Sequence, residues 1–373
     1  MALIEEWKKI CGRIEDPRIA RNKKHPLMSV LFVILCSCLA GIDNWVGMED
    51  YCKTNFAFFC KYFDLSSGVP SHDTLARVMR LIHPERFLEC FCEFTHLLSK
   101  QLRGVVAIDG KTARKSNSLD KSKNPLHLVS AWSSANHLVL AQVKTEDKSN
   151  EIKAIPKLLE MLDLSGEVVT IDAMGCQREI AEKILEKDAD YVLSLKGNQK
   201  SLHKDLQYLF QGFEENNWED FIGTRYESCE KDHSRIVTRK VWATEDLGDL
   251  TQQHQWPGLR SVILIESTRE IKGKKTTERR LYISSLPPDA ERAYGCIRSH
   301  WGIENQLHWV LDTTFNEDRS QISKDHSPEN MSLARKWALN ILRAVQGKKS
   351  LKRTQNYFYM NGNNLQEIFF KEI

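Results

Sequence analysis

The sequence predicts an α/β fold in which a mixed β-sheet carries packed helices and follows a helical segment. Two short runs, Val105–Ile108 and Val168–Ile171, are apolar and rich in β-branched residues, and a glycine follows each within a few positions. Such runs are typical of buried strands. An aspartate, Asp109 or Asp172, directly follows each run. Because a carboxylate beside a buried strand costs free energy unless a partner compensates it, the pattern favours a shared acidic site.

Residues 1–100 are predicted to form a small helical domain. Ser71 precedes a helical pattern of apolar residues and is expected to be its N-cap. The apolar run 27–42 has about 16 residues, short of the ~20 that a membrane span needs, so we interpret it as a core helix and not as an anchor. Other helices are expected at Leu27–Leu39, Asn44–Phe63 and Pro84–Leu98. Such a domain suits DNA binding, and it equally suits an accessory role of another kind.

Residues 104–197 are predicted to alternate between strands and helices. The expected strands are 105–108, 126–132, 138–143, 168–171 and 191–195, and the expected helices are 151–162 and 178–186. Three strands joined by short turns, followed by alternating helix and strand, describe a mixed sheet with helices packed on it. The order β-β-β-α-β-α-β is that of a ribonuclease H-like core.

The remaining residues are predicted to interrupt this core and then complete it. We interpret residues from about 200 to 288 as a mostly β insertion with strands at 226–230, 236–243, 261–266 and 279–284. Helices return up to residue 346, so that 101–346 form the predicted catalytic domain. Residues 347–373 form a basic, then aromatic, tail.

Composition excludes several classes of protein. The 373 residues include 53 Lys and Arg against 50 Asp and Glu, so the net charge of +3 is no strong nucleic-acid signal by itself. The ten cysteines include no C-x-x-C pair, which disfavours zinc and fits buried thiols in a reducing cytoplasm. The sequence also lacks a G-x-x-x-x-G-K-[ST] loop, so we expect no nucleotide cofactor.

Asp109 and Asp172 are expected to converge, because the first and fourth strands are neighbours in a ribonuclease H-like sheet. Two carboxylates a few ångströms apart repel each other, and a divalent cation removes that conflict. Oxygen ligands favour Mg²⁺, with Mn²⁺ as an alternative, over zinc. Two such ions about 4 Å apart would suit cleavage of a phosphodiester bond.

Glu304 is the predicted third ligand. It lies at helical spacing among apolar residues, and a carboxylate on an apolar helix face needs a compensating partner. A metal ion is one such partner. The alternative is a buried ion pair with Arg298, His300 or His308. Rival third ligands crowd into the expected end of the helix, at Asp312, Glu317 and Asp318.

Several residues near the acids are candidate contacts to DNA phosphates. Lys111 closely follows Asp109, and a solvated loop lysine is its alternative role. Lys196 and Asn198 follow the strand at 191–195, where a simple turn is the alternative. The other candidates surround Glu304: Arg298, His300 and His308.

These motifs resemble those of the H-repeat-associated transposases of bacterial insertion sequences, a branch of the DDE superfamily. The resemblance runs nearly end to end, through the stretches Pro70–Thr74, Ala107–Lys111, Thr170–Ala173, Leu195–Gln199 and His300–Asn305. It implies Asp109, Asp172 and Glu304 as the catalytic triad, with a β insertion before the glutamate. It also implies metal-dependent cleavage at element ends, 3′-hydroxyl strand transfer into target DNA, pairing of ends by a homodimer, and a cytoplasmic, nucleoid-associated location.

One departure from related cut-and-paste transposases limits what the resemblance implies. Those relatives carry Tyr, Arg and Lys at −7, −4 and +7 from the glutamate, where this chain has Ile297, His300 and Leu311. Their hairpin chemistry is therefore not carried over. Two alternative functions stay open: a ribonuclease H-like nuclease without strand transfer, and a catalytically silent relic that only binds DNA.

Overall fold

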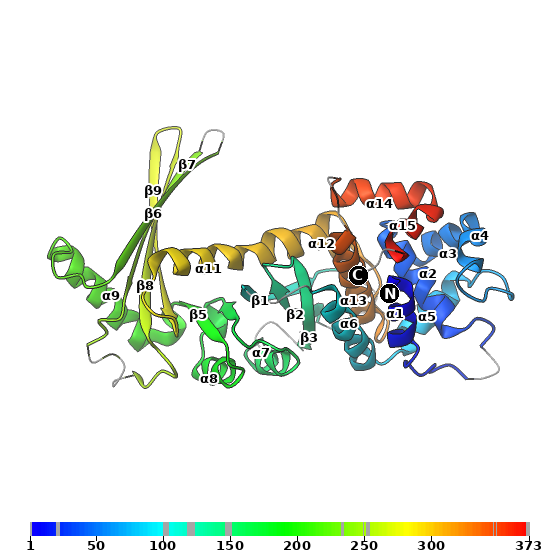
Figure 1. Ribbon diagram of the computed structural model, residues 1–373, viewed down its shortest axis with the longest axis horizontal. Helices are drawn as coiled ribbons and strands as arrows, with labels where there is room; N and C mark the ends of the chain where they lie inside the picture. Colours follow the sequence, from blue (N-terminus) through cyan, green and yellow to red (C-terminus); the bar gives the residue numbers. More distant parts are fainter. Residues whose placement is uncertain are drawn as a thin grey trace.

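The computed structural model has helices gathered near both chain ends and a sheet that extends away from them (Figure 1). It describes residues 2–19, 23–99, 104–117, 124–145, 151–232, 235–248, 250, 254–345, 347 and 349–370. Within these ranges no helix is both long and apolar enough to cross a membrane.

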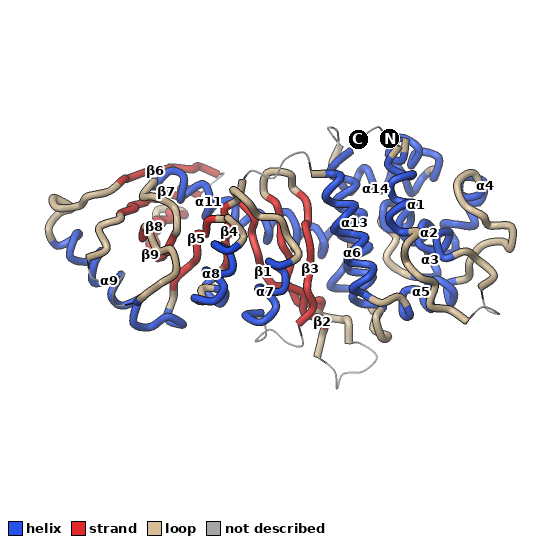
Figure 2. Tube along the Cα trace, turned by 60° about the horizontal axis from the view of Figure 1, so that its bottom comes forward, coloured by secondary structure: helices blue, strands red, loops and turns tan. Residues whose placement is uncertain are grey.

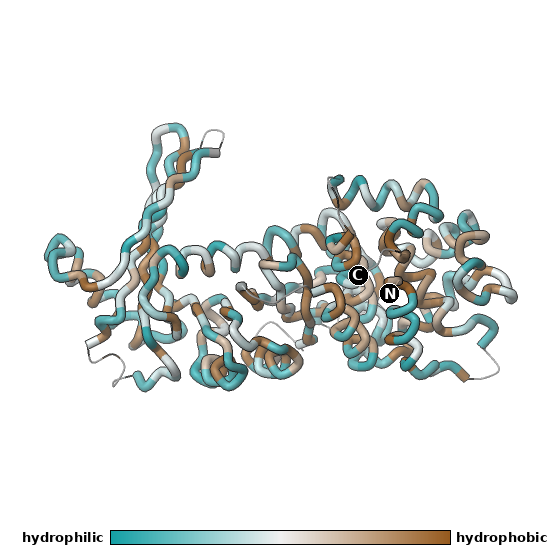
Figure 3. Tube along the Cα trace, in the orientation of Figure 1, coloured by the Kyte–Doolittle hydropathy of each residue, from teal (hydrophilic) through white to brown (hydrophobic). Residues whose placement is uncertain are grey.

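The N-terminal helices and the C-terminal helices pack into one apolar core. The N-terminal set is α1 (Leu3–Cys11), α2 (Leu27–Leu39), α3 (Trp45–Thr54), α4 (Phe56–Cys60), α5 (His72–Leu81) and α6 (Pro84–Leu98). The C-terminal set includes α13 (Ser327–Val345), α14 (Leu351–Met360) and α15 (Gln366–Phe369). Helix α13 packs on α2 and α6, and Figure 3 shows the hydrophobic colour concentrated there. The interpretation of residues 27–42 as a core helix is confirmed, because nearly all of α2 is buried.

Nine strands form one continuous sheet in the described residues. The core strands are β1 (Val105–Ala113), β2 (Leu126–Ser133), β3 (Leu138–Thr145), β4 (Val168–Ile171) and β5 (Asp190–Leu195). The remaining strands are β6 (Thr224–Asp232), β7 (Arg235–Thr244), β8 (Ser261–Ile271) and β9 (Lys274–Ser284). Their order is β3-β2-β1-β4-β5-β9-β8-β7-β6. Strand β1 pairs antiparallel with β2 and parallel with β4, as the ribonuclease H-like prediction requires, and the fold class is confirmed.

Helices cover both faces of this sheet (Figures 1 and 2). On one face lie α7 (Glu151–Glu160), α8 (Arg178–Glu186) and α9 (Lys200–Glu215), which share an apolar cluster with the strands. On the other face α11 (Ala290–Gly302) crosses β1, β4 and β5 and reaches β6 and β7. A π-helical turn, η5 (Ile303–His308), and α12 (Trp309–Thr313) continue α11.

The structure corrects three local predictions. Strand β1 continues beyond Asp109 to Ala113, because Lys111 and its neighbours keep pairing with β2. The single helix predicted at 44–63 is two, α3 and α4, divided at Asn55, whose side chain donates to the Tyr51 carbonyl and accepts from the Gly362 amide. The insertion also contains the unpredicted helix α9, and its strands extend the core sheet through β5–β9 pairing.

We expect Trp337→Ala to destabilise the fold strongly. Trp337 is 1% exposed and contacts the rings of Trp7, Phe87, Phe91 and Phe94. Truncating a buried tryptophan costs about 3–5 kcal/mol in free energy of unfolding. Denaturant unfolding measures it, with Trp309→Ala as the control, because Trp309 is 62% exposed. An equal effect of both variants would contradict the shared core.

Candidate active site

Two strands and one helix place the predicted triad on the same face of the sheet. In parallel pairing Ile108 is level with Ile171, so Asp109 and Asp172 lie side by side at the next position of each chain. Side chains alternate along a strand, which puts Asp109 and Asp172 on the face that α11 covers. Asp172 and Glu304 line one cavity of about 250 Å³ together with Lys196, Arg280 and His300.

Burial strongly affects the titration of Asp109. Burial raises its pKa to about 7, and the negative charges of Asp172, Glu304 and Glu151 act in the same direction, against one backbone hydrogen bond from Gly110. Burial and the neighbouring acids therefore make the ionised form of Asp109 unfavourable unless a cation compensates its charge.

Asp172 is held in place by its own chain turn. Its Oδ1 accepts hydrogen bonds from the amides of Met174 at 3.0 Å and Gly175 at 3.4 Å, in the 3₁₀ turn η3 (Ala173–Gly175). The next turn, η4 (Gly197–Gln199), is tied to η3 because Asn198 Nδ2 donates to the Ala173 carbonyl at 2.6 Å. Asn198 therefore supports the turn that orients Asp172.

Glu304 lies on the π-helical turn and its side chain is exposed. The prediction that it sits on the core-facing side of its helix is wrong, since Ile303 and Leu307 are the residues buried there. Its predicted ion-pair partners contact other groups: Arg298 lies 3.8 Å from Glu230, His300 contacts Thr170 at 3.1 Å, and His308 lies 3.5 Å from Asp109. π-Helical turns often occur at functional sites.

Lys111 lies in a buried ion-pair cluster and not in a solvated loop. Its ammonium is 2.7 Å from Asp312 Oδ1, 3.3 Å from Glu317 Oε2 and 3.3 Å from Asp318 Oδ1. These contacts favour a structural role for Lys111 over a contact to a DNA phosphate. They also occupy Asp312, Glu317 and Asp318, which were the alternative candidates for the third metal ligand. Although burial would raise the pKa of Glu317, the cations Lys111, Lys336 and Arg335 hold it at about 2.

Burial lowers the pKa of two histidines beside the acids. Burial lowers the pKa of His308 to about 3, with Lys336 and Lys111 adding to the effect. The contact between His308 Nδ1 and Asp109 Oδ2 therefore joins a neutral imidazole to a carboxyl group and is no ion pair. Burial also lowers the pKa of His300.

Sequence reasoning missed a buried group directly behind Asp109. Glu151 Oε1 contacts His127 Nε2 at 2.6 Å, and His127 Nδ1 contacts Thr112 Oγ1 at 2.7 Å. A Cβ on Gly110 would lie 2.3 Å from Glu151 Oε1, so only glycine leaves room for this chain of contacts. A glycine inside a strand marks such a close approach, and it was interpreted instead as the end of the strand.

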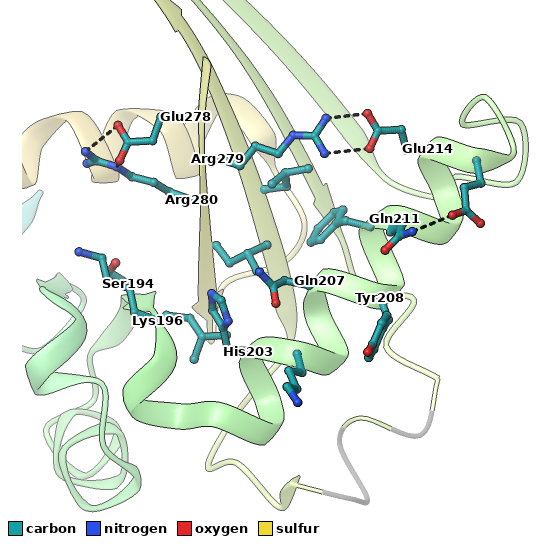
Figure 4. Close-up of a pocket in the computed structure, with 16 residues that line it drawn as sticks. Ser194, Lys196, His203, Gln207, Tyr208, Gln211, Glu214, Glu278, Arg279 and Arg280 are labelled. Atoms are coloured by element: carbon teal, nitrogen blue, oxygen red, sulfur yellow. Dashed lines mark hydrogen bonds and ion pairs between the residues drawn. The ribbon is translucent and has the colours of Figure 1, made fainter. Parts of the chain in front are cut away.

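A larger cavity of about 730 Å³ lies on the opposite face, between α9 and strands β5 and β9 (Figure 4). His203, Gln207 and Gln211 of α9 line it, and Arg279 closes one side by pairing with Glu214 at 2.6 Å. None of the three acids lines this larger cavity. It shares Ser194, Lys196 and Arg280 with the lining of the acidic cavity.

We expect Gly110→Ala to lower stability by about 1–3 kcal/mol, because the new methyl group overpacks a filled site. Gly212→Ala is the matched control: no heavy atom lies within 4 Å of its Cβ position, inside α9, where alanine should stabilise by about 0.5–1 kcal/mol. Thermal unfolding of both variants makes the comparison. A neutral Gly110→Ala would contradict the close approach of Glu151.

Comparison with known proteins places this architecture in a family. Residues 9–95 match the model described as DDE_Tnp_1-associated, and residues 100–341 match the model of the Transposase DDE domain. Among solved structures, a piggyBac transposase synaptic complex with hairpin DNA matches with a TM-score of 0.42 and 12% identity, over 96% of this chain and 76% of that chain.

Two relatives of known sequence match almost the whole chain, and a third matches part of it. "Putative transposase YncI" of Escherichia coli O157:H7 is 39% identical over 95% of this chain and 92% of its own length. "H repeat-associated putative transposase YhhI" of Escherichia coli K12 is 38% identical over 95% of both chains. "Inactive transposase YbfQ" of the same strain is 35% identical over 20% of this chain and 92% of its own length. The chain therefore belongs to the DDE transposase family, in the group of the H repeat-associated transposases.

Proposed function

We propose that this chain is an active transposase that cuts phosphodiester bonds at the ends of a DNA element and joins the freed 3′ hydroxyl to target DNA. The observation that carries the proposal is the gathering of Asp109, Asp172 and Glu304 on one face of the sheet, two of them in one cavity. Water would be the nucleophile for cleavage, and the 3′ hydroxyl for joining.

The acids fit divalent cations by their chemistry. All three donors are carboxylates, which suits Mg²⁺ or Mn²⁺, and Asp109 is largely buried beside other acids, which raises its pKa to about 7. Among the described residues no three His, Cys, Asp or Glu side chains are close enough together to hold one ion jointly. Asp109 and Asp172 would be the main ligands of such an ion, and the exposed Glu304 would complete the site. When bound, two metal ions would activate the attacking oxygen and stabilise the leaving oxygen.

The residues around the cavity suit contacts to DNA backbone. Lys196 is exposed at the rim, where its ammonium can meet a phosphate. Arg298 is exposed and paired only loosely with Glu230, so we assign it a phosphate contact as well. His300 lines the cavity as a neutral donor or acceptor, whereas Asn198 and His308 would position the two aspartates.

Double-stranded DNA is the proposed partner, both as element ends and as target. We propose a homodimer on paired ends, acting at the nucleoid in the cytoplasm. The two alternatives remain distinguishable: a nuclease would cut without joining, and a relic would bind ends without cutting. All three acids are present, which favours activity over the relic.

We expect Asp172→Ala and Glu304→Ala each to abolish Mg²⁺-dependent cleavage while keeping affinity for end-containing duplexes. A loss of about 4 kcal/mol or more in transition-state stabilisation corresponds to a fall of about a thousandfold in rate. The control is Glu182→Ala, which removes an exposed acid from α8 on the opposite face. Full cleavage by either triad variant would refute the site.

Strand transfer has its own test. Wild-type protein is given pre-cut ends with free 3′ hydroxyls and a target plasmid, and joined products are counted. We expect Mg²⁺-dependent joining. Cleavage of intact ends without joining would favour the nuclease alternative, and binding without either reaction would favour the relic.

We expect Asp109→Asn to stabilise the metal-free protein at pH 8. Because the folded pKa of about 7 exceeds the ordinary value of 3.8, the favourable contribution of this carboxyl is present below about pH 4 and is lost as pH rises towards 7. Asparagine removes the buried charge, so stability at pH 8 should rise by up to about 4 kcal/mol, with little change at pH 4. Thermal unfolding across pH measures this.

The same variant separates metal binding from folding. Added Mg²⁺ at pH 8 should raise the melting temperature of the wild-type protein and have a smaller effect on Asp109→Asn. Equal shifts in both proteins would show that Asp109 does not contribute to metal binding.

A further inference from the structure

Arginines gather on one face of the sheet extension, from Arg280 at the acidic cavity outward. Residues directly opposite in antiparallel pairs point to the same face, and Arg239 pairs with Ser267, Ile265 with Arg280, and Arg235 with Ile271. Side chains alternate along each strand, so one face carries the arginines 235 and 239 of β7, 269 of β8 and 280 of β9. We call these four residues the arginine face.

The arginine face borders a groove of about 640 Å³ that also takes in Arg298, Trp301 and Glu304 of α11 and η5. This groove and the acidic cavity share Arg280, Tyr282, Ile297, Trp301 and Glu304. A single surface therefore leads from the acids outward along the hairpins that stand away from the body in Figure 1.

The charges of this surface favour a polyanion. Five arginines line the groove against three glutamates, Glu230, Glu278 and Glu304. Glu230 forms ion pairs with two guanidinium groups, that of Arg239 at 3.1 Å and that of Arg298 at 3.8 Å. Arg280 pairs with Glu278 at 2.9 Å and lies over the Trp301 ring. The positive excess stands next to the site where DNA would be cut, and arginine binds phosphates through two parallel hydrogen bonds.

The length of the surface sets where along the DNA it would act. Six strand positions separate the Ile265–Arg280 pair from the Ile271–Arg235 pair. At about 3.4 Å for each residue this is a distance of about 20 Å. One strand of duplex DNA advances 3.4 Å for each base, so 20 Å corresponds to about six base pairs.

We propose that the arginine face grips the backbone of duplex DNA, contacting phosphates over about six base pairs outward from Arg280, which itself lines the acidic cavity. This rests on the proposed function, since it assumes that DNA enters the acidic cavity. The contact is to phosphates and not to bases, so it fixes the register of the duplex without reading its sequence.

The test compares two double variants that remove the same charge from opposite faces. Arg235→Ala with Arg269→Ala empties the outer arginine face. Lys240→Ala with Lys275→Ala, the control, removes exposed lysines from the other face of β7 and β9. The probe is a duplex taken from the DNA that borders the coding sequence, read by hydroxyl-radical footprinting and by affinity against salt concentration. Thermal unfolding checks that both variants fold.

The arginine variant should lose backbone protection at the end of this stretch that lies farther from the cut, and its slope of log affinity against log salt should fall by about 2, the value for two phosphate contacts. The lysine variant should keep both the backbone protection and the wild-type salt slope. The double variant Arg235→Lys with Arg269→Lys should restore the slope. An unchanged footprint and slope in a folded arginine variant would overturn the proposal and leave the proposed function standing. Failure of wild-type protein to bind any duplex would overturn both.

Discussion

The fold is organised around an unfavourable interaction, the burial of the Asp109 carboxyl in the central part of the sheet. Its neighbours make the burial worse, because Asp172, Glu304 and Glu151 all add negative charge. Strain of this kind is typical of functional sites, which keep groups that function needs at the cost of stability.

Two buried lysines of this region do not compensate the charge of Asp109, because both are engaged elsewhere. Lys111 is surrounded by Asp312, Glu317 and Asp318, and Lys336 donates to Ser130 at 3.0 Å and Gln142 at 2.6 Å. Burial lowers the pKa of Lys336 to about 8, so this ammonium is itself poorly solvated. The site around Asp109 therefore keeps an excess of negative charge, which the divalent cation that we propose would neutralise.

Patterns local in sequence were predictable, and contacts between distant segments were not. The strand run before Asp109, the Ser71 cap on α5 and the helix at 178–186 follow from spacing and residue type, and each occurs in the structure. The Glu151–His127 pair joins residues 24 positions apart. Gly110 leaves room for it, but a glycine in the sequence does not say which side chain approaches it. The sequence also gives no sign of the π-helical turn that carries Glu304, because the apolar residues around it are spaced as in an ordinary α-helix.

Pairing of β5 with β9 was equally hidden, and it connects the acids to the arginine face. Leu195 pairs with Leu281, and Leu193 pairs with both Ile171 and Ile283, so one hydrogen-bonded ladder runs from the strand before Asp172 to the residue after Arg280. An insertion attached by a flexible linker would lose conformational entropy each time it closed on DNA. A strand in the same sheet has already been ordered during folding. The arginines therefore meet the duplex at a fixed distance from the acids, and binding energy gained along the hairpins can position the bond to be cut.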